Sequence, residues 1–477
     1  MTATLLTVFF LVYLGMILGG LPFLQLDRTG VALLGAIALV GSGVVSTESA
    51  LAALHLPTLM LLFAFMVLSA QLRLGGFYAW VTLRLAAWPL RPALLLGALV
   101  GVVGALSAVF SNDVVCLAVA PVLIAACRRR GLAPLPYLLG LACAANVGSA
   151  ATLIGNPQNM LIGARLGLSF SGYLGEALAP VGLSLLATWA IIAALTRGRW
   201  YDVGPASQTG LRAGAQDPVW DPTLTISPDA ATRPDLSFNL SPDLSLDQSP
   251  ELAPSRSPAL GIMTTPAPRE ARDQRDEAEA ELDRWQAAKG LTVALALLGI
   301  FLFTDWPREL AALVGAGLLL TSRRLHSRRM LGLVDWELLV LFIGLFVVNH
   351  ALEASGLLAT GMAALAAVGL HLEQPGTLFA AAVVLSNLVS NVPAVMLLLP
   401  VATDPLAGPI LALASTLAGN LLLVGSIANL IVADAAERRG LRLDWRTHAR
   451  IGVPVTLATL AIAAAWLLWR AGPGAAI

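Results

Sequence analysis

The sequence predicts an all-α membrane protein with two repeated halves, and three observations carry this prediction. Hydrophobic residues make up 57% of the 477 residues and charged residues only 12%, about half of the charge that a soluble chain carries. Long apolar segments recur in the same order on both sides of a polar stretch, and polar residues recur within them at matching places. This composition excludes a soluble enzyme, a nucleic-acid-binding protein and a disulfide-rich secreted domain.

Twelve apolar segments are candidates for crossing or entering a membrane, since a spanning helix needs about 20 mostly apolar residues. The first set comprises residues 4–24, 30–47, 57–74, 92–127, 133–165 and 172–195. The second set comprises residues 288–304, 308–321, 335–353, 376–401, 407–433 and 449–470. We therefore expect a first transmembrane repeat over residues 1–196 and a second over residues 287–477.

The stretch between the two repeats, residues 197–286, is polar and acidic. Between Asp202 and Arg284 it holds 15 acidic and 7 basic residues, and it contains 11 of the chain's 28 prolines. It has too little apolar periodicity to offset the entropy of ordering its backbone. We expect a disordered linker with a charge-rich surface helix at its end, and a regulatory phosphorylated segment is the alternative.

The two halves repeat one another at nearly fixed offsets. The segment LFAFMVLSAQ from Leu62 aligns with LFIGLFVVNH from Leu341, 279 positions later. At the same offset Ser107, Ser111, Asn112 and Pro121 align with Ser386, Ser390, Asn391 and Pro400. After a shorter loop the offset is 270, and Gly155 and Asn159 align with Gly425 and Asn429. Internal repeats with apolar segments interrupted at matching places are typical of secondary transporters.

The arginines predict the orientation of the chain. We treat residues 92–127 and 376–401 as re-entrant hairpins, so that each half crosses the membrane about five times, an odd number, and the repeats are inverted. With the N-terminus outside, 18 loop arginines lie on the cytoplasmic side, and only Arg165, Arg308 and Arg470 lie outside. This distribution satisfies the positive-inside rule. It also places the linker in the cytoplasm.

Each predicted hairpin carries a polar motif, LSAVFSND from Leu106 and LSNLVSNV from Leu385. Ser107 and Ser111 are four residues apart, which favours one shared helix face, and Ser386 and Ser390 repeat this spacing. Polar groups at membrane depth are tolerated where they face protein or a water-filled cavity. Hydroxyl, amide and carbonyl oxygens are hard donors that suit Na⁺. We therefore predict Na⁺ sites here, and simple hydrogen bonding between helices is the alternative.

Each half also contains a predicted break in an apolar helix, within residues 133–165 and 407–433. Gly155, Asn156 and Pro157 interrupt the first helix, because proline removes a backbone donor and clashes with the preceding turn. A broken helix exposes carbonyls that attract cations and N–H groups that attract anions. Two breaks facing two hairpins would form a polar chamber, with Ser426 contributed by the second break. A simple proline kink is the alternative.

Asp113 is isolated from other charges along the chain, since its nearest charged neighbours in sequence are Arg91 and Arg128. An acid near the middle of a membrane either pairs with a cation or takes up a proton. Both cases suit a residue that couples ion movement to transport. A carboxylate at the start of the second hairpin helix, placed there to cap it, is the alternative.

These motifs resemble the ion-transporter superfamily, which includes citrate-transporter-like and divalent-anion:sodium symporters, arsenite efflux permeases and some Na⁺/H⁺ antiporters. The resemblance covers both halves and leaves out the linker. It implies an inverted-repeat fold, often dimeric, in which a transport domain moves against a scaffold domain by an elevator motion. It implies a first ion site at Ser107, Ser111, Asn112 and Gly155. It implies a second ion site at Ser386, Ser390, Asn391 and Gly425.

The sequence departs from the divalent-anion symporters at both hairpins, where Asp113 and Val392 stand in place of threonines. An ionised aspartate about 4 Å from a substrate carboxylate costs on the order of 4 kcal/mol at an effective dielectric constant near 20. A dianionic substrate therefore requires Asp113 to be protonated or paired with a cation. The first hairpin is in this respect similar to the arsenite permeases, whose substrate is neutral or nearly so.

We expect a secondary active transporter, not an enzyme, that moves a small anion across the cytoplasmic membrane with Na⁺ or H⁺ as coupling ion and no cofactor. The expected substrate contacts are Asn112, Asp113, Asn156, Pro157, Asn391 and Ser426. The expected partners are the substrate, membrane lipid and a second copy in a homodimer, with no nucleic acid. A Na⁺/H⁺ antiporter and an arsenite efflux permease are the alternative functions.

Overall fold

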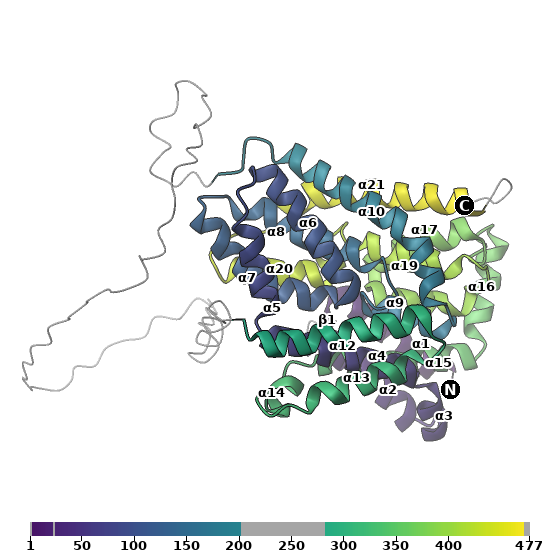
Figure 1. Ribbon diagram of the computed structural model, residues 1–477. Helices are drawn as coiled ribbons and strands as arrows, with labels where there is room; N and C mark the ends of the chain where they lie inside the picture. The colour runs from purple at the N-terminus through teal and green to yellow at the C-terminus, as the bar shows by residue number, and fades with distance from the viewer. Residues whose placement is uncertain (1, 22–23, 202–281, 472–477) are drawn as a thin grey trace, which may run out of the picture. The chain divides into compact units, whose positions relative to one another are not determined.

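The computed structural model describes residues 2–21, 24–201 and 282–471, and these fold almost entirely into helices (Figure 1). The predicted all-α class is thus confirmed. Apart from its two ends, the expected linker over residues 197–286, including the start of its predicted surface helix, lies outside the described residues.

The described residues before the linker form helices and one short antiparallel strand pair, in which Gly20 faces Asp27. The elements are α1 (Thr2–Leu18), β1 (Gly20–Leu21), β2 (Leu26–Asp27), α2 (Arg28–Gly41), α3 (Thr47–Ala53), α4 (Leu56–Leu74), α5 (Phe77–Ala86), α6 (Pro92–Val109), α7 (Asn112–Arg129), α8 (Pro134–Ser149), α9 (Pro157–Arg165) and α10 (Phe170–Leu195).

The described residues after the linker form a second series of helices in a similar order. The elements are α12 (Arg284–Phe303), α13 (Arg308–Leu320), α14 (Ser327–Leu331), α15 (Trp336–Ala354), α16 (Leu357–Ala367), α17 (Pro375–Val389), α18 (Asn391–Leu398), η3 (Leu399–Val401), α19 (Ala407–Ala418), η4 (Leu423–Gly425), α20 (Ile427–Glu437) and α21 (Trp445–Ala471).

Within the described residues, six helices are long and apolar enough to cross a membrane: α4, α6, α10, α12, α15 and α21. They identify the chain as a multi-pass membrane protein. The segments 92–127, 133–165, 376–401 and 407–433 are each divided into two helices in the structure. In each of them the division falls at the polar motif, because these residues interrupt the regular backbone hydrogen bonding of an apolar helix.

In one group of helices, the first helices of each half pack against a later helix of the other half. Helix α4 packs against α12 and α13, and α15 packs against α1 and α2. Side-chain caps begin several of these helices: Asp27 accepts a hydrogen bond from the Gly30 N–H at 2.8 Å, and Asp335 accepts one from the Leu338 N–H at 2.9 Å. Such caps satisfy amide groups that a helix start leaves without a partner.

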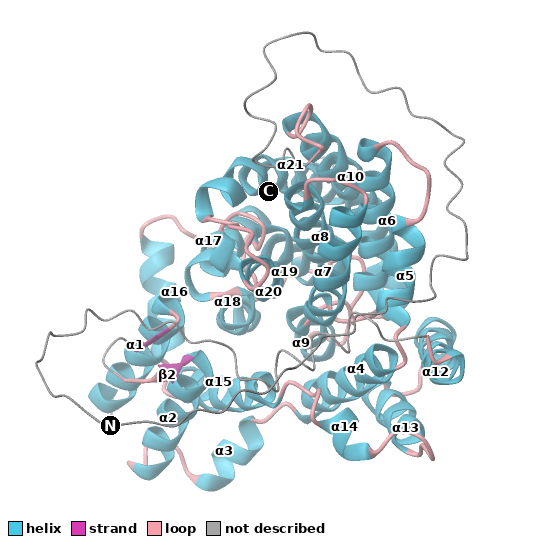
Figure 2. Ribbon diagram, turned by 90° about the vertical axis from the view of Figure 1, so that its left-hand side faces the viewer, coloured by secondary structure: helices cyan, strands magenta, loops and turns pink. Residues whose placement is uncertain are grey.

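A second group contains the divided segments, and α6, α7 and α8 stand side by side in Figure 2. Helix α8 packs against both α6 and α7, just as α19 packs against both α17 and α18. Contacts between the halves are extensive, since α7 and α8 contact α20, and α18 and α19 contact α9. Helices α10 and α21 lie against each other along one face (Figure 1).

Candidate functional site

The first tip, residues 107–113, comprises the end of α6, the connection at residues 110–111 and the start of α7, and its two serines lie differently from the sequence prediction. Helix α6 ends at Val109, and Ser111 lies at the start of α7 with non-helical backbone angles. Ser107 is fully buried and Ser111 only partly. The prediction that the two serines share one helix face is therefore wrong, because the helix ends between them.

In the second tip, residues 386–392, the single residue Ser390 connects α17 to α18, and its backbone is strained. Its φ of 80° and ψ of 159° lie in a region that residues with a side chain rarely occupy. The equivalent Ser111 has an ordinary φ of −53°. The two tips thus share a sequence pattern and differ in backbone conformation.

Ser390→Gly is expected to raise the melting temperature of the protein. Glycine removes strain worth about 1–3 kcal/mol, and the larger entropy of the unfolded glycine chain offsets about 0.5–1 kcal/mol of this gain. Ser111→Gly is the matched control, where only the entropy term acts and the melting temperature should fall slightly. Thermal unfolding in detergent measures both, and an equal decrease in the two variants would contradict the assignment of strain to Ser390.

The first break, residues 150–156, is held open by two asparagines. The Asn156 side chain accepts a hydrogen bond from the Asn159 N–H at 2.8 Å and so caps α9, which starts at Pro157. The Asn159 amide donates to the Thr152 carbonyl at 2.9 Å and more weakly to the Ser149 carbonyl at 3.4 Å. These bonds satisfy carbonyls that lost their helical partners at the break.

The second break, residues 419–426, is built in the same way. Asn429, which aligns with Asn159, donates to the Gly419 carbonyl at 2.9 Å and to the Leu422 carbonyl at 3.2 Å. Gly419 and Leu422 align with Ser149 and Thr152 at the offset of 270. The same side chain therefore holds the same two carbonyls in each half.

A buried hydrogen-bond network joins the first tip to the second break, and Asn146 of α8 lies at its centre. The Asn146 side-chain oxygen accepts from the Asn112 side-chain amide at 3.0 Å and from the Ser426 hydroxyl at 2.9 Å. Its amide donates to the side-chain oxygens of Asn420 at 2.8 Å and Asn429 at 3.1 Å. We call these five residues the Asn146 network.

Thr416 of α19, which aligns with Asn146, makes the reciprocal contacts to the first break. Its hydroxyl accepts from the amides of Asn156 and Gln158, each at 3.2 Å. Each half thus hydrogen-bonds the broken helix of the other half from an equivalent position. Asn146 and Thr416 were missed in the sequence because their residue types differ, although the offset of 270 aligns them.

The predicted first ion-site residues lie close together. The Asn112 N–H donates to the Gly155 carbonyl at 3.3 Å. Gly155 has so little free space that a Cβ there would lie 2.8 Å from the Ser107 carbonyl oxygen. In the second half a Cβ on Gly425 would lie 3.2 Å from the Asn387 side-chain oxygen, and one on Gly419 would lie 3.3 Å from the Asn391 amide nitrogen. Each tip therefore contacts the break of its own half.

Five side-chain oxygens at the tips are buried without a hydrogen-bond partner among the described residues. Four of them form two aligned pairs, the hydroxyls of Ser107 and Ser386 and the side-chain carbonyls of Asn112 and Asn391. The fifth, on Asn387, has no counterpart in the first half, because Ala108 aligns with Asn387. Buried polar atoms are nearly always paired in folded proteins, so unpaired ones call for an explanation such as a bound ion or water. Hydroxyl and amide oxygens together are suitable ligands for Na⁺.

Asp113 lies in the first turn of α7, directly after Asn112. Its side chain is partly buried, and no hydrogen bond or ion pair joins its carboxylate to another residue in the described parts of the chain. The residues of the two tips and the Asn146 network include no arginine or lysine. Asp113 is thus the one formal charge among the tip residues.

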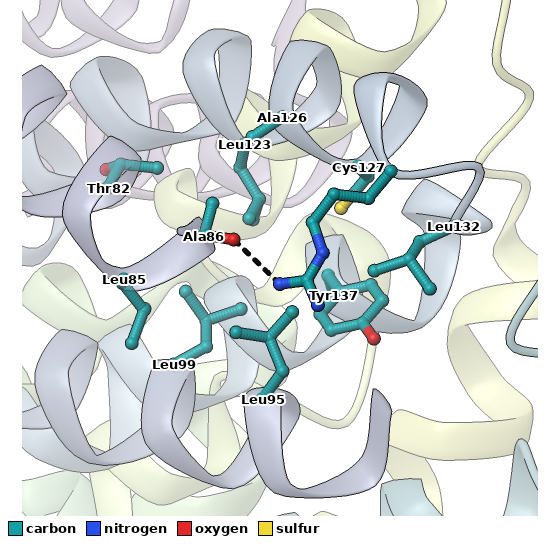
Figure 3. A pocket seen from close by; sticks show the side chains of 11 residues that line it. Thr82, Leu85, Ala86, Leu95, Leu99, Leu123, Ala126, Cys127, Leu132 and Tyr137 are labelled. Carbon is teal, nitrogen blue, oxygen red and sulfur yellow. Dashed lines mark hydrogen bonds between the residues drawn. The ribbon is translucent and has the colours of Figure 1, made fainter. Parts of the chain in front are cut away.

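The pocket drawn in Figure 3 lies at the far end of the first hairpin and is not part of this site. Its volume is about 10 Å³ and its lining is mostly apolar, including Leu95, Leu99 and Leu123. Arg130 closes it by donating to the Ala86 carbonyl at 2.7 Å. Such a volume barely admits one water molecule. We interpret this pocket as a packing gap in the base of the hairpin.

Broken helices that place hydroxyls, amides and free backbone groups inside a multi-pass helical protein define a membrane transporter. The comparisons identify the family. The citrate transporter family profile, CitMHS, matches residues 10–409, and the chain belongs to this family.

Relatives of known name cover nearly the whole chain. It is 33% identical over 467 residues to the silicon efflux transporter LSI3 of Oryza sativa subsp. japonica, with 92% of each chain covered. It is 27% identical over 471 residues to an uncharacterized transporter, Rv2685, of Mycobacterium tuberculosis, with 94% of each chain covered. It is 26% identical over 490 residues to transporter arsB of Dictyostelium discoideum, with 92% of this chain and 87% of that one covered. The chain is therefore a transporter and not an enzyme.

Proposed function

We propose that the chain is a secondary active transporter of the cytoplasmic membrane that moves a small inorganic hydroxy acid, or its anion, coupled to Na⁺ or H⁺. The observation that carries the proposal is the aligned set of unpartnered oxygens on Ser107, Asn112, Ser386 and Asn391, two of them in each half of the chain. One ion site in each half, with substrate between them at Asn156, Pro157 and Ser426, accounts for this symmetry.

The chemistry of the site favours a neutral or weakly charged substrate. Amides and hydroxyls hydrogen-bond well to the hydroxyls of a small oxyacid. A polyanion such as citrate would meet the Asp113 carboxylate and no basic side chain of the tips, so it would need bound cations as partners. The names of two relatives, a silicon efflux transporter and arsB, favour the same substrate class.

The packing supports an inverted-repeat arrangement with an elevator motion. The group formed by α1, α2, α4, α12, α13 and α15 would be the scaffold, and the tips and breaks would belong to the transport domain. In each half the third long helix packs against the first two helices of the other half. Such intertwining is what two inverted repeats produce when they assemble around one pseudo-twofold axis.

Na⁺ is expected to raise the melting temperature of the purified protein relative to choline at equal ionic strength. A ligand at a hundredfold its Kd adds about 2.7 kcal/mol of stability. Asn112→Ala and Asn391→Ala should each reduce this Na⁺-dependent shift, because each removes one of the unpartnered oxygens. Asn349→Ala, at an asparagine of α15 whose oxygen already accepts from the Tyr13 hydroxyl at 2.7 Å, is the control that should keep the full shift.

If Na⁺ has no effect on the wild type, the Na⁺ sites are contradicted and H⁺ becomes the coupling ion of the proposal. Asp113→Asn should then abolish uptake or efflux driven by a pH gradient in proteoliposomes, with silicic acid, arsenite and citrate compared as substrates. Na⁺-dependent proton release without any of these substrates would instead support the Na⁺/H⁺ antiporter.

A further inference from the structure

His448 of α21 is a buried histidine that the proposed mechanism does not use. It is only 1% exposed, and its Nε2 lies 3.0 Å from the Asn420 carbonyl oxygen. A carbonyl oxygen only accepts, so Nε2 carries the proton in this contact. The other ring nitrogen, Nδ1, is buried and has no hydrogen-bond partner among the described residues. The lone pair on Nδ1 is therefore available for a second proton.

In the first half a different residue hydrogen-bonds the equivalent backbone carbonyl. There the Tyr173 hydroxyl of α10 donates to the Ala150 carbonyl at 2.7 Å. Ala150 aligns with Asn420 at the offset of 270, so both side chains bind the equivalent carbonyl just after the helix breaks. A phenol does not gain a proton near neutral pH, whereas an imidazole does. The second half thus has a group that can take up a proton near neutral pH where the first half has none.

The carbonyl that His448 binds belongs to a residue of the Asn146 network. The Asn420 side chain accepts from Asn146 at 2.8 Å and donates to the Cys143 carbonyl at 3.3 Å. Gly452, one turn after His448, leaves the necessary space, since a Cβ there would lie 2.4 Å from the Asn420 oxygen and 2.7 Å from Nε2. A movement of the imidazole would therefore remove a hydrogen bond from Asn420, a residue of the second break.

Within the part of the chain that the structure describes, no counter-charge faces the imidazole from the elements packed most closely against α21. These are α8, α10, α19 and η4, and the one charged residue on them is Glu176 of α10. Glu176 is ion-paired with Arg470 near the other end of α21. The other titratable groups on these elements are Tyr137 and Cys143 of α8 and Tyr173 of α10.

The nearest charged groups to His448 on its own part of the chain are exposed. They are Asp444, Arg446 and Arg450. The site consequently fits a neutral imidazole, and an imidazolium gains a charged partner only by turning outward toward Asp444.

We propose that His448 is a proton-binding site, and that protonation at Nδ1 releases the Asn420 carbonyl and loosens the second break. The proton comes from a hydronium ion in the solvent at the start of α21: an O–H bond of the hydronium breaks, an N–H bond forms at Nδ1, and a water molecule is left, with no other change in covalent bonds. The buried imidazolium then has one donor too many for its surroundings and leaves the Asn420 contact. The consequence for transport rests on the proposed function, whereas the proton site does not.

The test compares thermal unfolding of the full-length wild type and H448Q at about pH 8 and about pH 5.5, which bracket the range in which histidine changes charge. Glutamine keeps an N–H donor for the Asn420 carbonyl but cannot take up a proton in this range. The hydroxyl and N–H of Thr447 hydrogen-bond to Asp444 and lower the pKa of its carboxyl, so Asp444 stays ionised at both pH values. The other four histidines are common to both proteins, so the difference between them reports on His448.

The wild type should lose about 1–2 °C more than H448Q between the two pH values, the shift that roughly one factor of ten in the folding equilibrium gives in a chain of this size. Equal losses in the two proteins would overturn the proposal. If H448Q does not fold, H448Y takes its place, since it uses the phenol that the first half uses, and the same comparison applies.

Flux assays in proteoliposomes separate this proposal from the proposed function. If protonation loosens the second break, the wild-type rate should change at least about threefold between the two pH values, within the range over which a histidine titrates, and the H448Q rate should not. A protein that transports none of the tested substrates, yet shows the pH-dependent difference in melting temperature, would refute the proposed function and support the proton site. A pH-dependent rate that persists unchanged in H448Q would refute the role of His448.

Discussion

Gly155→Ala is expected to abolish transport and to lower stability by about 3 kcal/mol, the upper end of the usual cost of overpacking. A Cβ at this position would lie 2.3 Å from the Ser149 carbonyl oxygen, 2.7 Å from the Ser149 Cα and 2.8 Å from the Ser107 carbonyl oxygen. All three are backbone atoms, so no side chain can rotate away to make room. The methyl group would therefore push the first tip away from the first break.

Gly425→Ala is the matched control, because Gly425 aligns with Gly155 and has more space. Its nearest contacts would be the Gly419 carbonyl oxygen at 3.1 Å and the Asn387 side-chain oxygen at 3.2 Å. Asn387 is a side chain that can shift, so we expect a loss below about 1.5 kcal/mol and measurable flux. Gly101→Ala, with no atom within 4 Å, should behave as the wild type. Equal losses at residues 155 and 425 would contradict this account of the first tip.

The positions of the tips and breaks could be predicted from the sequence because they depend on local chemistry. Gly155, Asn156 and Pro157 cannot continue an apolar helix, and α8 indeed ends before them and α9 starts at Pro157. The same reasoning located the divisions near Ser390 and Ser426. It failed for the shared face of Ser107 and Ser111, since a spacing of four implies a common face only while the helix continues.

The contacts between the halves could not be predicted, because hydropathy does not specify which helix packs on which. The bonds from Asn146 to Asn420 and Asn429 join residues about 280 positions apart, and they form only when α8 and α20 meet. His448 likewise follows no sequence pattern, since Tyr173 performs the equivalent role. The predicted orientation, dimer, coupling ion and substrate contacts stay predictions.

Asn146→Ala is expected to be the most damaging substitution outside the tips and breaks themselves. It would leave the amide of Asn112, the hydroxyl of Ser426 and the side-chain oxygens of Asn420 and Asn429 without their partner. Hydrogen bonds between membrane helices contribute on average about 0.6 and at most about 1.7 kcal/mol each, so four of them give a loss of about 2–7 kcal/mol. Flux should be lost as well, because the first tip would no longer be tied to the second break.

Thermal unfolding measures the loss of stability, and flux in proteoliposomes measures the loss of transport. Two further variants serve for comparison with Asn146→Ala. Thr416→Val keeps the side-chain shape at the aligned position and removes a hydroxyl that accepts from Asn156 and Gln158, so a smaller loss is expected. Asn349→Ala removes an asparagine that hydrogen-bonds Tyr13 outside the network, and it should retain flux. If Asn146→Ala lost no more stability and flux than Asn349→Ala, the Asn146 network would be ordinary helix packing. We expect the losses of stability and flux to be largest for Asn146→Ala, smaller for Thr416→Val and smallest for Asn349→Ala. This order would show that transport depends on the hydrogen bonds between the halves.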